Sequence, residues 1–135
     1  MTVLRKPDSA LVLAIEGDFV VVVRQTRDGA GERTVELPGG SVEEDETPEA
    51  CAARELLEEC GLAAASWRKL GTFWAAPDYA TEHVHVFEAT ELVDVGAGER
   101  EEGDDLECDR LPLRGLIDEL SEAGSLAALA LWLRG

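Results

Sequence analysis

The stretch that decides the fold runs from residue 40 to residue 62 and reads GSVEEDETPEACAARELLEECGL. Thr47 suits the N-cap of a helix and Pro48 suits its first position. Gly61 suits the left-handed residue that follows the last helical turn. The stretch therefore predicts a helix between Thr47 and Gly61, reached from a glycine-rich turn, Pro38-Gly39-Gly40, through an acidic loop.

Three glutamates of this helix, Glu55, Glu58 and Glu59, are spaced so that their side chains share one face. Like charges four residues apart destabilise a helix by roughly 0.2–0.5 kcal/mol per pair. A divalent cation removes that repulsion, and Mg2+ is typically held by one or two carboxylates together with substrate phosphates. A solvated surface helix can carry the same charges, but it explains neither the glycine turn nor the spacing of Glu46 and Arg54.

The stretch resembles the Nudix box of the Nudix hydrolases. Gly40, five residues, Glu46 and seven residues lead to Arg54-Glu55-Leu56-x-Glu58-Glu59-x-Gly61-Leu62, which matches every specified position of that motif. The family hydrolyses nucleoside diphosphates linked to another group. The resemblance implies a single Nudix domain over residues 1–135, a small-molecule nucleoside diphosphate substrate, and Mg2+ as the cofactor, with Mn2+ able to substitute.

The resemblance also implies roles for individual residues. Metal ligands would be the carboxylates of Glu55, Glu58 and Glu59 and the backbone carbonyl of Gly39, and Glu58 and Glu59 would also serve catalysis. Arg54 would act in catalysis by orienting a box glutamate, which its i+4 neighbour Glu58 supports. Glu46 would lie near the metal.

The chemistry implied is the attack of water on one phosphorus atom of a pyrophosphate, helped by metal and by a carboxylate base. In ADP-ribose pyrophosphatases of this family the base comes from an acidic loop before the last strand. Here that loop contains Glu102, our first choice, followed by Glu101 and Asp104. The same run of charge is also typical of a solvated loop, and some family members use a box glutamate instead.

The region after the box, GTFWAAPDYATEHVHVFEAT over residues 71–90, resembles the corresponding region of ADP-ribose pyrophosphatases. Pro77 occupies the place of that subfamily's marker proline and Glu82 that of its acidic residue. The resemblance implies hydrolysis of ADP-ribose to AMP and ribose 5-phosphate, and a homodimer as the assembly. The loop reads Ala-Pro-Asp instead of the usual Ser-Pro-Gly, which is a departure from the pattern.

Two aromatic residues near this loop, Trp74 and Tyr79, could stack on an adenine or a ribose. Core packing is an equally simple role for Trp74 and is slightly favoured, whereas the polar surroundings of Tyr79 favour stacking. Tyr79 also lies near a tyrosine marker of diadenosine polyphosphate hydrolases. Alternative substrates are therefore a (d)NTP or a dinucleoside polyphosphate. A non-catalytic nucleotide sensor is an alternative of another class, which the presence of all three box glutamates disfavours.

Composition limits the class of protein and the partners that this chain can have. The chain has 135 residues and a formal net charge of −17, which suits one domain and opposes binding to nucleic acid. No apolar run is long enough to span a membrane and no signal peptide is recognisable, so we expect a cytoplasmic protein without a membrane partner. The three cysteines lack metal-ligand spacing, so we expect reduced, mostly buried thiols.

Hydrophobic patterns outside the box predict an α/β fold, an α/β/α sandwich with a mixed β-sheet. The resemblance implies the same architecture, a Nudix-type α/β/α sandwich. Residues 10–15 and 19–24 read as a hairpin, residues 26–34 as a loop, and residues 35–37 as a brief strand. Further strands are expected at 66–74, 83–90 and 106–111, and helices at 113–120 and 125–133, separated by Ala123-Gly124. His83 and His85 alternate with valines on one strand, and we expect them not to be metal ligands.

Overall fold

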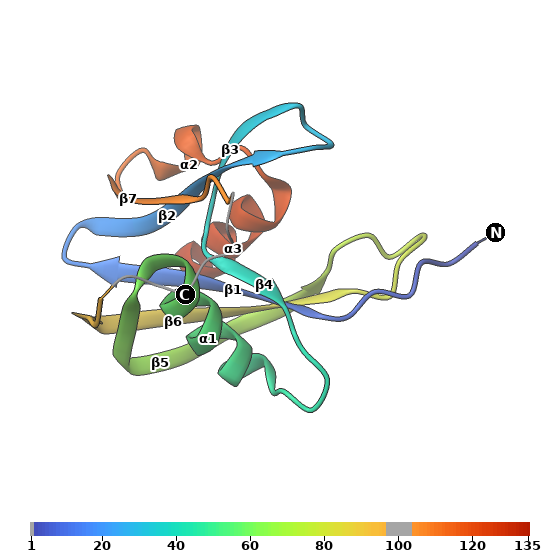
Figure 1. Ribbon diagram of the computed structural model, residues 1–135, viewed down its shortest axis with the longest axis horizontal. Helices are drawn as coiled ribbons and strands as arrows, with labels where there is room; N and C mark the ends of the chain where they lie inside the picture. The colour runs from blue at the N-terminus through green and yellow to red at the C-terminus, as the bar shows by residue number, and fades with distance from the viewer. Residues whose placement is uncertain (1, 97–103) are drawn as a thin grey trace.

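A single mixed sheet is the framework of the computed structural model, which describes residues 2–96 and 104–135 (Figure 1). Its strands follow the order β3-β2-β1-β6-β5, with β4 paired to β1 and β7 paired to β2. The strands are β1 Ser9–Glu16, β2 Phe19–Arg27, β3 Glu32–Glu36, β4 Gly39–Ser41, β5 Leu62–Trp74, β6 His83–Asp94 and β7 Glu107–Pro112. The sheet is mixed because β1 runs parallel to β6 and antiparallel to β2 and β4.

The predicted first hairpin is present, with Ile15 opposite Val20 and Gly17 in the turn at a φ of 60°. The loop predicted at residues 26–34 is shorter than expected, because β2 continues to Arg27 and pairs with Glu32 at the start of β3. The polar residues of this segment lie on an exposed hairpin end, where strands need no apolar run. Their polarity concealed the strand.

Helices cover both faces of the sheet, so the expected α/β/α sandwich is confirmed (Figure 1). The side chains of β1 alternate between the two faces. Val12 packs with Leu56 of helix α1, Pro48–Cys60, whereas Leu13 packs with Leu129 of helix α3, Ala123–Arg134. The result is one apolar core on each side of the sheet, joined through its central strand.

Helix α1 begins and ends where the sequence predicts. The Thr47 side chain accepts a hydrogen bond from the Ala50 backbone N–H at 3.1 Å, and Pro48 follows as the first helical residue. Gly61 ends the helix in the left-handed region at a φ of 63°, with its N–H bonded to the Leu57 carbonyl at 2.9 Å. The caps therefore fix which residues of the box face the sheet.

The C-terminal helices differ from the prediction. The helix expected at 113–120 is reduced to the single turn α2, Leu116–Glu119, and Ala123-Gly124 begins α3 instead of separating two helices. The cause is Glu122, whose carboxylate accepts hydrogen bonds from the N–H groups of Gly124 at 2.7 Å and Ser125 at 2.9 Å. None of the helices in the described part of the chain has the length and apolar character needed to cross a bilayer.

The expectation of three reduced thiols is wrong for two of them. Cys60, the last residue of α1, is disulfide-bonded to Cys108 of β7, with the two Cα atoms 5.7 Å apart. Cys51 is a free, buried thiol, as expected. Spacing along the chain could not reveal the pair, because 48 residues separate its members and only the fold brings β7 beside the end of α1.

Reducing this disulfide should lower the melting temperature by roughly 8–12 °C, because a crosslink of this loop length typically contributes about 2–4 kcal/mol. Thermal unfolding with and without a phosphine reductant measures the change. The Cys60→Ser/Cys108→Ser double variant is the control, and its melting temperature should not respond to reductant. Detection of all three cysteines as free thiols in the denatured, unreduced protein would contradict the pairing.

Candidate active site

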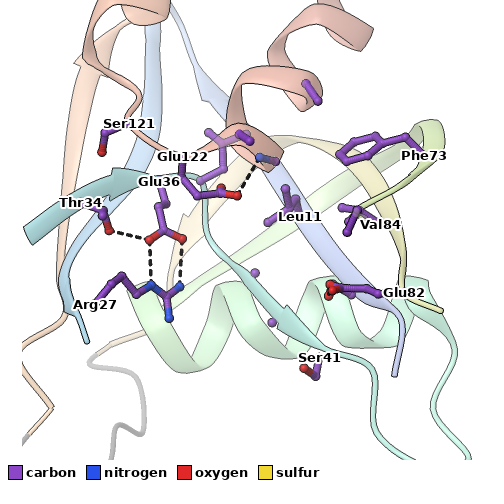
Figure 2. Close-up of a pocket in the computed structure, with 18 of the residues that line it drawn as sticks. Leu11, Arg27, Thr34, Glu36, Ser41, Phe73, Glu82, Val84, Ser121 and Glu122 are labelled. Atoms are coloured by element: carbon purple, nitrogen blue, oxygen red, sulfur yellow. Dashed lines mark hydrogen bonds and ion pairs between the residues drawn. The ribbon is translucent and has the colours of Figure 1, made fainter. Parts of the chain in front are cut away.

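A cleft of about 930 Å³ opens along β4, on the side of the sheet where α3 begins (Figure 2). The backbone of Gly39 and Gly40 lines the cleft between two groups of side chains. The first group is Arg27, Thr34, Glu36, Ser121 and Glu122, and the second is Lys6, Leu11, Phe73, Trp74, Glu82 and Val84. The volume of the cleft lies within the range of small-molecule binding sites.

Gly39 and Gly40 belong to the strand β4, and not to the turn predicted at this point. Close packing requires glycine at both positions. Neither glycine has a positive φ. A Cβ added to Gly39 would lie 2.2 Å from the carbonyl oxygen of Ala10 in β1. A Cβ added to Gly40 would lie 2.5 Å from a carboxylate oxygen of Glu55. Glycine therefore lets β4 fit between β1 and the acidic face of α1.

The carboxylate of Glu59 lies directly behind this strand, where it accepts a hydrogen bond from the Gly39 N–H at 2.9 Å. Burial raises the pKa of Glu59 to about 8, and the nearby charge of Glu55 adds to the effect. Burial likewise raises the pKa of Glu55, despite the favourable charge of Arg54. Neither carboxylate is among the described residues that line the cleft. Both lie behind the β4 backbone, and the protein alone stabilises their charged forms poorly.

Arg54 holds the other acidic side chains of the motif in place. Its guanidinium donates to Glu46 at 2.7 and 3.0 Å, to Glu55 at 2.9 Å and to Glu58 at 3.2 Å. These are the contacts expected of a residue that orients a box glutamate, and the catalytic role of Arg54 stays a prediction. They also show that Glu46 is its two-point partner, and the bonds from Arg54 lower the pKa of Glu46 to about 2.

The acidic face fits a divalent cation by its chemistry. Its donors are all oxygens, as Mg2+ and Ca2+ prefer, and within the described part of the chain Glu59 forms no ion pair with a basic side chain. Within residues 2–96 and 104–135, no three acidic, histidine or cysteine side chains converge on one point at ligand distance. Arg54 holds Glu55 and Glu58 while Glu59 binds Gly39, so ion binding requires these side chains to turn.

The predicted substrate-binding residues divide into two groups. Trp74 and Glu82 line the cleft, and Glu82 binds Lys6 at 3.1 Å and the Ser9 hydroxyl. The preference for Trp74 as a core residue is wrong, because 52% of its surface is exposed. Pro77 and Tyr79 are exposed on the loop between β5 and β6, outside the set of described residues that line the cleft.

Of the three residues predicted as candidates for the general base, Asp104 lies within the described part of the chain. Glu101 and Glu102 lie outside the described residues. Asp104 is exposed, and its carboxylate accepts a hydrogen bond from the Leu106 N–H at 2.9 Å.

An ion pair that the sequence did not suggest lines the other side of the cleft. Arg27 donates from Nε and Nη2 to the two oxygens of Glu36 at 2.8 and 2.9 Å, and Thr34 donates to Glu36 at 2.5 Å. Burial opposes ionisation of Glu36, but these bonds keep its pKa below the usual value. Because the segment was expected to be a loop, the cross-strand relation of Arg27 and Glu36 was not visible from sequence.

The sequence is similar to those of known proteins over most of its length. The family model of the NUDIX domain matches residues 5–128. An ADP-ribose pyrophosphatase from Bacillus subtilis is 40% identical over 91 residues, covering 67% of this chain and 49% of that protein. An ADP-ribose pyrophosphatase from Mycobacterium tuberculosis is 37% identical over 132 residues, covering 90% of this chain and 64% of that protein.

The fold also matches a solved structure. A crystal structure of an ADP compounds hydrolase superposes with a TM-score of 0.84 and 26% identity, covering 95% of this chain and 73% of that one. The chain spans about half to just under two thirds of the length of the two pyrophosphatases. These similarities confirm the resemblance inferred from the motif.

The two glycines of β4 should respond differently to alanine. Gly39→Ala forces a methyl group against backbone and should destabilise the fold by roughly 3 kcal/mol. Gly40→Ala meets only the movable end of Glu55, so it should change the melting temperature little while displacing that carboxylate and reducing activity by about tenfold or more. Paired measurements of thermal unfolding and turnover test this difference, and equal destabilisation by both variants would contradict it.

The buried acid also predicts the pH dependence of stability. Because the pKa of Glu59 is raised from 4.5 to about 8 on folding, the folded state holds this proton more tightly than the unfolded chain. Stability of the metal-free protein should therefore fall between pH 6 and pH 8, with a decrease in melting temperature of roughly 5–10 °C. Calorimetry in a chelator measures the decrease, and Glu59→Gln should remove most of it. A flat profile for the unaltered protein would show that Glu59 is already ionised.

Proposed function

The chain belongs to the NUDIX domain family, and from this premise we propose that it hydrolyses the pyrophosphate bond of a nucleoside diphosphate derivative. One observation carries the proposal. The described motif residues Arg54, Glu55, Glu58 and Glu59 form a connected acidic cluster directly behind the glycine strand that lines the cleft. A pyrophosphate lying along β4 would be next to these carboxylates.

ADP-ribose is the proposed substrate, and AMP and ribose 5-phosphate are the proposed products. Support comes from the two relatives named ADP-ribose pyrophosphatase and from the match to the ADP compounds hydrolase. The cleft of about 930 Å³ is large enough for a nucleotide with a second group attached. The enzyme would therefore act on a small molecule and bind its two halves on opposite sides of β4.

Mg2+ is the proposed cofactor, with Mn2+ as a substitute, held by Glu55, Glu59 and Glu58 with the Gly39 carbonyl. When bound, the metal supplies charge stabilisation to the phosphoryl oxygens and lowers the pKa of a coordinated water. The charges that line the cleft support this proposal, because Lys6 and Arg27 face Glu36, Glu82 and Glu122 in the same cleft. These side chains alone do not attract an anion.

The protein's own groups would prepare the reaction. Arg54 binds Glu55 and Glu58, and the Gly39 N–H binds Glu59, so the three carboxylates stay beside β4 until they turn toward a cation. Arg27 lines the cleft, and its Nη1, which Glu36 does not use, can donate to a phosphate oxygen. Glu102 remains our first choice to accept the proton of the attacking water.

The decisive experiment is turnover of the purified protein with Mg2+ on ADP-ribose, nucleotide sugars, dNTPs and a dinucleoside polyphosphate, with AMP release measured by chromatography. Glu59→Gln should lower kcat roughly 10²–10⁴-fold, because it removes a ligand of a cation that stabilises the transition state by several kcal/mol. Glu49→Gln makes the same chemical change in the exposed first turn of α1 and should leave turnover unchanged.

The outcomes separate the alternatives. Near-normal turnover by Glu59→Gln would show that the metal site is wrongly assigned. Preference for a dNTP or a dinucleoside polyphosphate would retain the chemistry and change the substrate. Nucleotide binding without turnover of any compound would identify a non-catalytic sensor.

A further inference from the structure

The cleft consists of two arms of different chemistry that meet at the backbone of Gly39 and Gly40. Figure 2 shows Leu11, Phe73 and Val84 on one side and Arg27, Thr34 and Glu36 on the other. The apolar arm contains Leu11, Phe73, Trp74 and Val84 together with the ion pair of Lys6 and Glu82. The polar arm contains Arg27, Thr34, Glu36, Ser121 and Glu122. A substrate that spans β4 must therefore place one half in each environment.

Trp74 is the largest side chain of the apolar arm and the most unusual one. About half of its surface, 52%, is exposed. Its ring rests on the imidazole of His83, with ring centroids 3.7 Å apart and planes tilted by 37°. An aromatic ring that is supported from one side and still half exposed within a cleft is suited to stacking on a ligand.

The support beneath Trp74 is fixed by the sheet and by Asp8. Trp74 and His83 are directly opposite each other in the β5–β6 ladder. The backbone N–H of His83 donates to Asp8 at 3.0 Å, and the same carboxylate lies 3.0 Å from Nε2 of His85. The imidazole is therefore anchored through its strand, and the indole above it has a defined position before any ligand binds.

A role in binding a protein partner is less consistent with this geometry. Trp74 lines the same cleft as Gly39, Gly40 and Glu82, so a group that stacks on it must enter a concavity of about 930 Å³. A concave site of this size matches a small molecule. Exposed aromatic residues at protein interfaces lie on more extended surfaces.

We propose that Trp74, supported by His83, is the platform on which the base of the nucleotide stacks. The other half of the substrate then lies in the polar arm, where the hydroxyl groups of a sugar meet Arg27, Thr34 and Glu36. This inference rests on the proposed function, because it orients the substrate across the same metal-binding strand.

The orientation also defines the class of substrate. Among the described residues that line the cleft, the aromatic ones are Phe73 and Trp74, and both belong to the apolar arm. A second base in the polar arm would find no aromatic ring among the described lining residues, whereas a sugar would find hydrogen-bonding groups. A nucleoside diphosphate sugar therefore suits the cleft better than a dinucleoside polyphosphate does.

The test separates base binding from catalysis. Trp74→Ala should raise KM for ADP-ribose about 10–100-fold and leave kcat within about threefold, because base stacking is lost while the reacting groups are unchanged. Trp74→Phe should retain most of the affinity. Calorimetric titration with AMP should show the same loss in Trp74→Ala, whereas ribose 5-phosphate, which has no base, should bind equally to both proteins.

Phe19→Ala is the matched control, because Phe19 is an aromatic residue of similar exposure, 46%, that lines a separate hollow with Pro112 and Trp132. It should alter neither KM nor AMP binding. His83→Ala should raise KM about 3–10-fold by releasing the indole, and His83→Phe, which retains a ring beneath Trp74, should restore it. Melting temperatures of all variants check that the fold is intact.

Each result bears on one proposal. Equal KM and equal AMP affinity in Trp74→Ala and the unaltered protein would overturn the platform, as would failure of the unaltered protein to bind AMP at millimolar concentration. AMP binding that depends on Trp74 in a protein that hydrolyses none of the tested compounds would support the platform and reject the proposed activity.

Discussion

The close approach of the β4 backbone to helix α1 is the constraint on which the rest of the site depends. Gly40 leaves space for the carboxylate of Glu55, and Gly39 donates its N–H to Glu59 while it packs against β1. A side chain at Gly39 would collide with β1, and one at Gly40 would displace the carboxylate of Glu55 on the helix. The glycines therefore bring a backbone strand that lines the cleft into contact with the acidic face of the helix.

This arrangement has an electrostatic cost that the protein offsets only in part. Arg54 binds Glu46, Glu55 and Glu58, whereas the carboxylate of Glu59 accepts a hydrogen bond from the Gly39 backbone N–H and has a raised pKa. A buried carboxylate without a compensating cation destabilises the fold above its normal pKa. In the proposed metal site the same property would make Glu59 a strong ligand, because a bound cation would remove the penalty. Burial of Glu59 therefore lowers the stability of the metal-free fold and would raise its affinity for a metal ion.

The box helix could be predicted closely from sequence because its determinants are local. Thr47, Pro48 and Gly61 set its ends, and the spacing of its glutamates defines a face without reference to the rest of the chain. Features that depend on contacts between distant segments could not be predicted in this way. Examples are the disulfide between Cys60 and Cys108 and the pair of Arg27 with Glu36 across a hairpin hidden by polar residues.

The same distinction separates the chemistry of the site from its specificity. The acidic cluster comes from one continuous motif, whereas the cleft walls come from the N-terminal segment, the β2–β3 hairpin, the β5–β6 pair and the start of α3. Side chains on these elements can change without disturbing the contact between β4 and α1. A motif that fixes the reaction can therefore coexist with walls that select different nucleotides. For this chain, the identity of the substrate must be sought in Trp74, His83 and Arg27, which lie outside the motif.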